Sequence, residues 1–345
     1  MNKMRKAINL TLSVLAAVLA ISLIFTLPSG AVTEDAQNRY FDALWEESVD
    51  GDFVSRRKPL AVLASAVFSD ILPAANVNGL DGDLFAPGNT PIAENFTEAG
   101  YRDDTIIVEM EQKRMFDSDV FIAYVKIATP SQIRTAIAGN KLSSTRTNQT
   151  SVITAAYNGI VGINGDYYSD SNRQGGHIVR QGQVLRERVS DNFDLLFIDE
   201  LGDLHVFHRG KKDQTDAVAA FKSEHEIVNG FCFGPGLVID GKKPEDVSQY
   251  KWFDPNSENP RAAIGQLDTL TYVLVAVNGR TDESIGVTMD QFADIMLELG
   301  CQQAYNLDGG NSATLAFNGA VYNTKVQKER DVSDIIYFAS ATDAE

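Results

Sequence analysis

The chain has 345 residues, of which 44% are hydrophobic and 22% are charged, so it is long enough to bury a sizeable globular core. Its net charge is −17, from 47 acidic and 30 basic residues. A chain this acidic does not offer the basic surface that binding to a nucleic-acid backbone requires. We therefore expect no nucleic-acid partner. A small phosphorylated ligand is compatible with this charge, because one or two local arginines can bind it.

The N-terminus combines basic residues with a long apolar run. Residues 1–6 contain three basic side chains, and residues 7–27 are uncharged and mostly apolar, close to the ~20 residues that span a bilayer. We predict a cytoplasmic basic tail at 1–6 and a signal anchor at 7–27, with a cleaved signal peptide as the alternative. The charge asymmetry predicts a single-pass protein of the cell membrane whose main domain is extracytoplasmic, or a secreted protein after cleavage.

Residues 28–95 are predicted to form a stalk or linker with short helices. Within it, residues 60–72 place apolar side chains at helical spacing, and residues 73–91 are rich in Gly, Asn, Asp and Pro, as loops are. The single main domain is expected to cover residues 96–345.

The main domain opens with two strands. Thr105–Met110 and Asp119–Ala128 alternate between apolar and polar side chains, which predicts β-structure. Thr129–Gln132 has a proline at its second position and is predicted to open a helix. A further helix at Thr150–Tyr157 is expected to lead into a short strand at Ile160–Ile163.

Two hairpins are predicted next. The first pairs His177–Val179 with Val184–Leu185, and the second pairs Leu195–Ile198 with Leu204–Phe207. Each pair of apolar runs is separated by a short glycine-containing turn, as hairpins require.

The last third alternates strands and a helix. Thr271–Val277 is an apolar strand, and Thr288 with Gln291 forms a capping box for a helix that Gly300 ends. Ala304–Leu307 reads as the next strand. This strand–helix–strand unit predicts an α+β fold, a mixed sheet with packed helices behind the N-terminal anchor. Around Asn318-Gly319 we predict a type I′ hairpin between Leu315–Phe317 and Val321-Tyr322.

Cysteine and histidine give little sign of a metal. Cys232 and Cys301 lie far apart, and we favour two buried free thiols over a single disulfide. His205, His208 and His225 are expected at the solvated surface, and without clustered Cys/His spacing we expect no structural zinc site. No cofactor is predicted, although a calcium ion among carboxylates stays an open alternative.

Polar residues gather where predicted strands end, which is where sheet proteins build their sites. Asn164 and Asp166 follow one strand, and Arg261 precedes a small apolar stretch. Asn278 and Arg280 follow another strand. A turn or a surface charge would explain each of these clusters alone.

The segment Asn306–Thr314 is the strongest candidate. Asp308 ends a strand, and Gly309-Gly310 would let the backbone approach a ligand closely. A hairpin turn would need the two glycines but not the polar residues packed around them. His177, which follows the Asp166 cluster, titrates near neutral pH in its unperturbed state.

Carboxylate pairs act at the anomeric carbon of sugars, and arginines bind phosphate oxygens, so a site with both suits a glycosyl phosphate. We predict Asp166 and Asp308 as catalytic residues and no metal ligand. The predicted substrate-binding residues are Asn164, His177, Arg261, Asn278, Arg280, Asn306, Gly309, Gly310, Asn311 and Ser312.

The order of these segments resembles the phosphodiester glycosidase domain family. The similarity runs from about Val120 to Ala339, and the segments that carry it are Ile163–Tyr168, Phe233–Val238, Pro260–Gly265, Gly279–Thr288, Asn306–Thr314 and Glu329-Arg330. The resemblance implies hydrolysis of N-acetylglucosamine 1-phosphodiesters, releasing the sugar and leaving a phosphomonoester. It also implies a glycan or sugar-phosphate substrate in the cell envelope or an exopolysaccharide.

Two positions depart from the family pattern, which often has Asp in place of Asn278 and a further glycine in place of Asn311. Losing a carboxylate alters the acid/base groups that such a site can offer. The alternative function is therefore a non-catalytic glycan-binding or polysaccharide-assembly module.

Overall fold

The computed structural model describes residues 86–139, 146–166, 176–187, 192–210, 214–323 and 328–342. The predictions for the basic tail, for the anchor at 7–27 and for nearly all of the linker concern residues outside these ranges. Within the described ranges, no helix combines the length and hydrophobicity needed to cross a bilayer.

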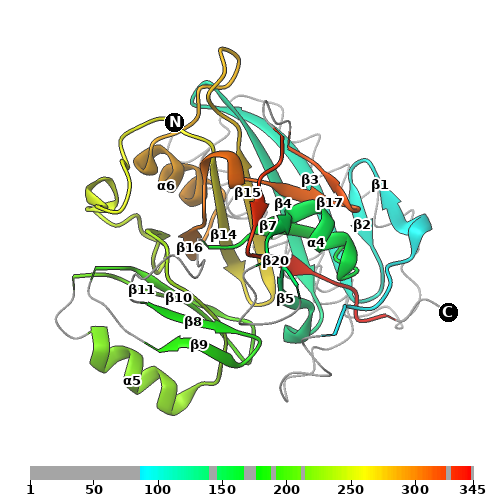
Figure 1. The fold of residues 1–345 in the computed structure, drawn as a ribbon, viewed down its shortest axis with the longest axis horizontal. Helices are drawn as coiled ribbons and strands as arrows, with labels where there is room; N and C mark the ends of the chain where they lie inside the picture. The colour runs from blue at the N-terminus through cyan, green and yellow to red at the C-terminus, as the bar shows by residue number, and fades with distance from the viewer. Residues whose placement is uncertain are drawn as a thin grey trace, which may run out of the picture. The chain divides into compact units, whose positions relative to one another are not determined.

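The largest sheet has eight strands in the order β1-β2-β3-β4-β15-β14-β16-β13 (Figure 1). Its strands are β1 (Phe96–Thr97), β2 (Gly100–Arg102), β3 (Ile106–Met115), β4 (Ser118–Ile127), β13 (Gly236–Val238), β14 (Arg261–Asp268), β15 (Thr271–Val277) and β16 (Gln303–Asn306). The predicted strands at 105–110, 119–128, 271–277 and 304–307 are confirmed within a few residues at their ends.

Two five-stranded sheets and one pair of short strands complete the β-structure. One sheet has the order β11-β10-β12-β8-β9, the other β18-β17-β7-β20-β5, and β19 pairs with β6. The strands are β5 (Ile133–Ile137), β6 (Asn148–Gln149), β7 (Val161–Asn164), β8 (His177–Arg180), β9 (Gln183–Glu187), β10 (Leu195–Asp199), β11 (Leu204–Phe207), β12 (Ile227–Phe231), β17 (Leu315–Phe317), β18 (Ala320–Val321), β19 (Asp331–Val332) and β20 (Asp334–Phe338). Both predicted hairpins are confirmed.

The described chain is mostly sheet, with three α-helices: α4 (Thr150–Ala156), α5 (Gln214–Glu224) and α6 (Met289–Glu298). Single 3₁₀ turns lie at Ala93–Asn95, Pro130–Gln132, Val247–Gln249 and Gly310–Ser312. Every pairing between described strands is antiparallel, so the prediction of a mixed sheet is wrong in this respect. Strands β15 and β16 do run in the same direction, but β14 lies between them and pairs with both.

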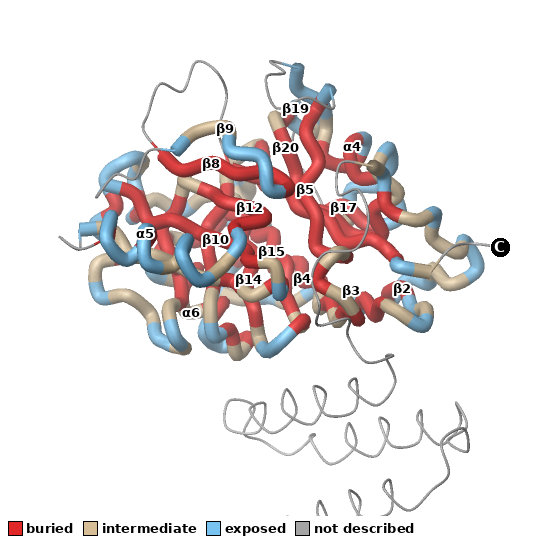
Figure 2. Tube along the Cα trace, turned by 90° about the horizontal axis from the view of Figure 1, so that it is seen from below, coloured by how far each residue is buried: buried red, intermediate tan, exposed pale blue. Residues whose placement is uncertain are grey.

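The main core lies between the large sheet and the two smaller ones. Side chains such as Phe121 and Leu274 from the large sheet pack against Ile163 and Phe338 from one small sheet and Leu196 from the other. The central strands are accordingly buried along most of their length (Figure 2). The two small sheets thus share one apolar layer, which fixes their strand ends relative to β14 and β16.

The other face of the large sheet is covered by α6. Phe292 and Met296 of this helix pack against Val273 and Val275 of β15. The Thr288 side chain accepts a hydrogen bond from the Gln291 amide at 3.2 Å, and Gly300 beyond the helix end has φ +89°, so the predicted capping and termination are confirmed.

The remaining two helices lie on the outer faces of the small sheets. Ile153 of α4 packs with Ile335 and Tyr337 of β20. Val218 of α5 packs with Leu195 and Phe197 of β10, in a small separate core beneath the helix. Every described helix therefore covers a sheet face.

One local prediction is wrong. The helix expected to open at Thr129 is a single 3₁₀ turn, Pro130–Gln132, and the chain continues at once as β5. The Thr129–Gln132 capping box is formed, but the β-branched and apolar residues that follow pair with β20 instead of extending a helix. The Asn318-Gly319 turn is as predicted, with both residues at positive φ.

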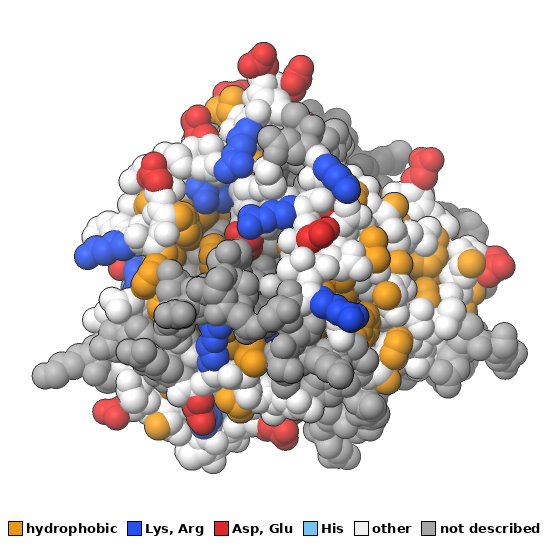
Figure 3. Space-filling model, viewed as in Figure 1, with side chains coloured by type: hydrophobic (Ala, Val, Ile, Leu, Met, Phe, Trp, Pro, Cys, Tyr) orange, Lys and Arg blue, Asp and Glu red, His pale blue; other side chains and the backbone are white. Residues whose placement is uncertain are grey.

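Residues 86–95, expected in the linker, pack on the domain. Gly88 donates its amide to the Tyr157 carbonyl at 3.0 Å, and Asn89 forms a β-bridge with Ser340. The packed part of the described chain therefore begins at residue 86, before the boundary expected at residue 96. On the face drawn in Figure 3, described basic side chains lie among acidic, polar and hydrophobic ones.

Candidate active site

A cavity of about 380 Å³ lies beyond the end of β16. Its lining brings together seven of the residues that the sequence predicted as site residues: Arg261, Arg280, Asn306, Asp308, Gly309, Gly310 and Asn311. It adds six that were not predicted: Phe233, Phe253, Asp254, Ser257, Asn259 and Arg330. The cavity therefore combines the partly buried Asp308 carboxyl and the exposed Asp254 carboxyl with three arginines and two aromatic rings.

The Asp308 loop is held by contacts with its own domain. Asn164 Nδ2 donates to the Asp308 carbonyl at 2.7 Å, and the Gly310 amide donates to the Pro260 carbonyl at 2.8 Å. A Cβ on Gly309 would lie 2.8 Å from the Pro260 carbonyl oxygen, and Gly310 has φ +59°. The two glycines thus permit close approach to the Pro260 backbone, which explains them without a ligand.

The Asp308 carboxyl has a raised pKa. Burial raises its pKa above the ordinary value, while a hydrogen bond from Ser312 and the nearby charge of Arg330 act in the opposite direction. A carboxyl with a raised pKa on a cavity wall is a candidate general acid.

Two arginines are fixed on the opposite side of this loop. Arg261 is 6% exposed and donates to the Val287 and Ser257 carbonyls at 3.1 and 2.8 Å. Burial, with Arg280 nearby, lowers the pKa of Arg261 to about 10, which still leaves it charged at neutral pH. The sequence placed both residues in the site, and the structure brings them to one cavity.

Arg280 is held by two amide side chains. Its Nη2 donates to Asn259 Oδ1 at 2.8 Å, and its Nη1 donates to Asn311 Oδ1 at 3.3 Å. Arg280 itself has φ +68°, a conformation that places its side chain over the Gly310 turn. Asn311, one of the two departures from the family pattern, thus positions a cavity arginine.

One wall of the cavity is aromatic. The Phe233 and Phe253 rings stack with centroids 5.8 Å apart and an angle of 16° between their planes. The Arg261 guanidinium carbon lies 5.4 Å from the Phe253 centroid. This wall offers a flat apolar surface beside the cationic groups.

Asn306 supplies a free acceptor. Its Nδ2 donates to the Gly234 carbonyl at 2.7 Å, but its buried Oδ1 has no hydrogen-bond partner among the described residues. An unpaired buried acceptor is costly, and a ligand hydroxyl or amide in the cavity would satisfy it.

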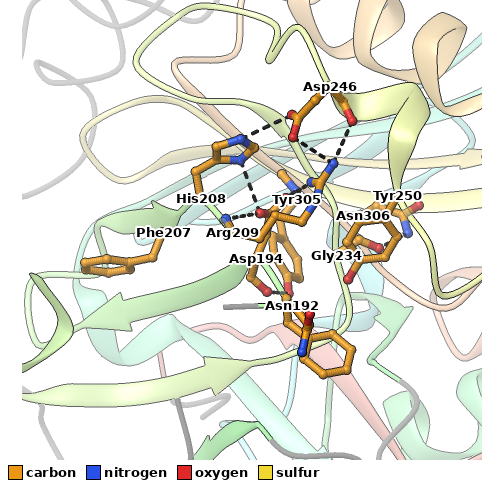
Figure 4. A network of polar contacts seen from close by, with 12 residues as sticks. Asn192, Asp194, Phe207, His208, Arg209, Gly234, Asp246, Tyr250, Tyr305 and Asn306 are labelled. Carbon is orange, nitrogen blue, oxygen red and sulfur yellow. Dashed lines mark hydrogen bonds and ion pairs between the residues drawn. The ribbon is translucent and has the colours of Figure 1, made fainter. Parts of the chain in front are cut away.

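The segment that carries Phe233 is fastened by a polar network centred on Asp194 (Figure 4). The fully buried Asp194 carboxylate accepts from the Gly236 amide at 2.7 Å and from Arg209 Nη1 at 2.9 Å. Tyr305 Oη donates to the Asp194 carbonyl at 2.8 Å and accepts from the Phe233 amide at 2.9 Å.

His208 belongs to the same network, 3.2 Å from Asp194 and 3.2 Å from Asp246. Its contact with the Asp194 carboxylate raises the pKa of His208. The solvated surface expected for His205, His208 and His225 is therefore wrong in part: each is only partly exposed and lies beside a buried carboxylate.

Asp166 lies in a buried ion cluster instead of on the cavity wall. Arg180 donates to Asp166 Oδ1 at 2.5 Å and to Asp334 Oδ2 at 2.6 Å, and the Cys232 amide donates to Asp166 Oδ2 at 2.9 Å. All three charged side chains are at most 1% exposed. Burial raises the pKa of Asp334 to about 7 even though Arg180 opposes the shift.

This cluster adjoins the Asp308 loop. The Asp308 amide donates to the Gly165 carbonyl at 3.3 Å, next to Asp166. Any side chain on Gly165 would collide with the Asp334 carboxylate. Neither Arg180 nor Asp334 was predicted, because β8, β7 and β20 bring them together from distant parts of the chain.

Four other predicted residues lie outside the cavity lining. Asn164 and Ser312 both contact Asp308, as described above. Asn278 accepts a hydrogen bond from Asn323 Nδ2 at 3.2 Å. His177 is buried edge-on against Phe197, and burial lowers its pKa to about 4. The substrate-binding role predicted for these residues therefore remains a prediction.

Two of the unpredicted lining residues, Phe233 and Arg330, could have been predicted from the sequence, because they lie in segments that resemble the family pattern. Phe253, Asp254 and Ser257 lie in a loop that matched no motif in the sequence.

In the described ranges, Asp199, Glu200 and His225 are the side chains grouped closely enough to share a metal ion, and they are outside the cavity. Cys232 and Cys301 form no disulfide with each other; Cys301 is buried, as predicted, whereas Cys232 is only partly buried.

Comparison with known proteins gives one family and two informative relatives. A family model described as phosphodiester glycosidase matches residues 157–339. The uncharacterised SPbeta prophage-derived protein YomE of Bacillus subtilis (strain 168) is 40% identical over 95 residues. Those residues are 28% of this chain but only 15% of that protein, so the chain matches a small part of its relative's length.

A solved structure shares the fold. The catalytic domain of zebrafish N-acetylglucosamine-1-phosphodiester alpha-N-acetylglucosaminidase, auto-inhibited by its pro-peptide, aligns with a TM-score of 0.53. The alignment covers 73% of this chain and 87% of that one, at 16% sequence identity.

Proposed function

The chain belongs to the phosphodiester glycosidase family, and from that membership we propose that it hydrolyses the bond between a sugar's anomeric carbon and a phosphodiester oxygen. The sugar is N-acetylglucosamine or a close analogue, and the products are the free sugar and a phosphomonoester. The observation that carries the proposal is that the raised-pKa carboxyl of Asp308 shares one cavity with Arg261, Arg280 and Arg330.

The arginines suit the phosphate part of the substrate. A phosphodiester carries one negative charge, and guanidinium groups donate two hydrogen bonds in the geometry of phosphate oxygens. Because Arg261 and Arg280 are already held by carbonyl and amide oxygens, they offer their charge without reordering on binding. They would also stabilise the anionic phosphomonoester that leaves.

Asp308 is the proposed proton-transfer group. In its protonated form it would donate its proton to the departing phosphate oxygen while water attacks the anomeric carbon. Cleavage of the C–O bond releases the sugar and the protonated phosphomonoester, and the proton lost by the attacking water passes through solvent to reprotonate Asp308. The catalytic role predicted for Asp166 from the sequence remains a prediction. Both of its oxygens are engaged by Arg180 and the Cys232 amide, which supports a role in holding the Asp308 loop.

The aromatic wall and Asn306 suit the sugar part. The apolar face of a pyranose ring would pack on the stacked Phe233 and Phe253 rings, and Asn306 Oδ1 would accept from a sugar hydroxyl or the acetamido N–H. Such contacts would orient the anomeric carbon toward Asp308.

We also propose that the domain acts outside the cytoplasm, tethered to the membrane through residues 7–27, on envelope or exopolysaccharide glycans. The support is the basic, then apolar, N-terminal sequence. Labelling of intact cells with a membrane-impermeant reagent would test it: a domain reached only after lysis would contradict this placement.

The activity is tested with the methyl phosphodiester of N-acetylglucosamine 1-phosphate, followed by ³¹P NMR with the purified full-length protein. The expected result is conversion to methyl phosphate with release of the sugar. The alternative of a non-catalytic glycan-binding module predicts binding by calorimetry with no product, and that outcome would replace the proposal.

A further inference from the structure

Two histidines and two acidic residues meet where β10 turns into β11 and α5 ends. Asp199 closes β10, Glu200 follows it in the turn, His205 lies in β11, and His225 comes directly after α5. This place is outside the cavity, and neither the glycosidase proposal nor the family match assigns it a role.

Three of the four residues have ligand atoms close enough together to share one small ion. Asp199 Oδ2 is 2.9 Å from His205 Nε2 and 3.4 Å from His225 Nδ1, and Glu200 Oε1 is 3.8 Å from the same Nδ1. Asp199, Glu200 and His225 each offer one ligand atom within 4.8 Å of the others. Ligands bound tetrahedrally at 2.0–2.2 Å are about 3.3–3.6 Å apart. His205, which is outside this group of three, must move away from Asp199 Oδ2 and closer to the other ligand atoms for all four residues to share one ion.

The carboxylates are aimed by other contacts. Asp199 is buried, and its Oδ1 accepts the Leu201 and Asp203 amides at 2.9 Å each, which leaves Oδ2 directed at the imidazoles. Glu200 Oε2 accepts the Glu226 amide at 2.8 Å, which directs Oε1 toward His225. Outer contacts of this kind orient metal ligands.

Both imidazole rings pack against the ring of Phe221. Its ring centroid lies 4.6 Å from that of His205 and 4.5 Å from that of His225, with the second pair stacked at 14°. The two histidine rings are 5.6 Å apart. A single aromatic side chain thus holds both imidazoles beside Asp199.

One polar atom in the cluster points to a ligand. His225 Nδ1 is buried and has no hydrogen-bond partner within the described part of the chain. This nitrogen faces the Asp199 and Glu200 carboxylates at 3.4 and 3.8 Å, which is longer than an ordinary hydrogen bond, and a metal ion between them would take its lone pair.

We propose that Asp199, Glu200, His205 and His225 bind a divalent transition-metal ion of the Zn²⁺ class. Two imidazole nitrogens with two carboxylates favour such an ion over Ca²⁺ or Mg²⁺, which take oxygen ligands. The ion would join the end of α5 to the β10–β11 turn and stabilise this sheet. The proposal departs from the sequence expectation of no zinc site, which rested on motif spacing that a site assembled by tertiary structure does not need.

The test uses purified full-length protein without a polyhistidine tag, stripped with EDTA and titrated with ZnCl₂ by calorimetry. We expect one equivalent to bind with a Kd in the micromolar range or below, and the melting temperature to rise by several degrees. CaCl₂ at the same concentration should leave the melting temperature unchanged. An equal response to Ca²⁺ would overturn the assigned ion class.

The double variant His205→Gln/His225→Gln should weaken Zn²⁺ binding at least tenfold. The matched control Asp216→Asn/Glu224→Gln removes two exposed acids of α5 and should bind like the wild type. Wild-type protein with Co²⁺ should show the intense visible absorption of a tetrahedral site, which decides the matter even if the double variant fails to fold. No saturable binding, an unchanged Kd in the double variant, or equal loss in the control would refute the site.

Discussion

Two groups of arginine and aspartate in this protein differ in burial and in what their charges contact. Arg180, Asp166 and Asp334 form a closed cluster in which Arg180 donates to both carboxylates and no charged side chain is more than 1% exposed. In the cavity, Asp308 and the exposed Arg280 line open space, and Arg280 is held by neutral amide side chains.

The difference indicates a division of roles. Charges that neutralise one another in a dry interior fix the positions of strands, whereas charges held by neutral groups next to a cavity stay available to a ligand. Substitutions in the first group should therefore act on stability, and those in the second on activity.

The largest effect is expected in the cavity. Asp308→Asn keeps the shape of the side chain but removes its proton, so kcat/KM should fall about 10²- to 10⁴-fold while the free energy of unfolding changes little. Steady-state kinetics and urea unfolding of the same preparations measure both. Asp282→Asn, an exposed residue outside the cavity lining, is the control and should keep full activity. Full activity in Asp308→Asn would remove the proposed proton donor.

Substitutions in the buried Arg180 cluster should instead reduce stability. Arg180→Met leaves two buried carboxylates without their cation, which is expected to cost about 3–5 kcal/mol of unfolding free energy in urea. The control Arg114→Met removes the partly exposed Arg114–Asp119 pair and should cost less than about 1 kcal/mol. Equal losses in the two variants would contradict a structural role for the buried cluster.

A smaller effect is expected from the cavity arginine. Arg280→Lys keeps the charge but loses the planar fork that Asn259 and Asn311 orient, so kcat/KM should fall about 10- to 100-fold. Its melting temperature should match the wild type. A variant that melts much earlier yet keeps its kcat/KM would place Arg280 with the structural group.

The last expected effect is a change in the pH dependence of stability. Because the pKa of Asp334 is raised to about 7 in the folded state from 3.8, the folded protein holds a proton that the unfolded chain releases. This contribution is complete below pH 3.8 and is lost as the pH rises toward 7. Urea unfolding between pH 4.5 and 8 should therefore show a shallower decline for Asp334→Asn, by at most about 1.4 kcal/mol per pH unit. Parallel profiles would contradict the raised pKa.

The elements that sequence patterns predicted are those with local causes. Helix α6 follows from its Thr288 capping box and Gly300, and the β17–β18 hairpin follows from Asn318-Gly319. Helix α5 was missed because few of its side chains are buried, Val218 and Gln214 among them, so its sequence has little apolar periodicity.

The candidate site was predicted where residues follow strand ends and missed where tertiary structure assembles it. Asp308 and Arg261 stood in recognisable segments, and the sheet order brings them together. Phe253 lies in a loop, and Arg180 reaches Asp334 across 154 positions of sequence. No local pattern encodes such a pairing, which depends on how the small sheets pack.

The central claim, that Asp308 and the arginines cleave a sugar–oxygen bond, is tested most directly by hydrolysis in H₂¹⁸O. Water attacking the anomeric carbon would place ¹⁸O in the released sugar and none in the methyl phosphate, as read by mass spectrometry. Label in the phosphate would instead show cleavage of the phosphorus–oxygen bond and contradict the glycosidase mechanism.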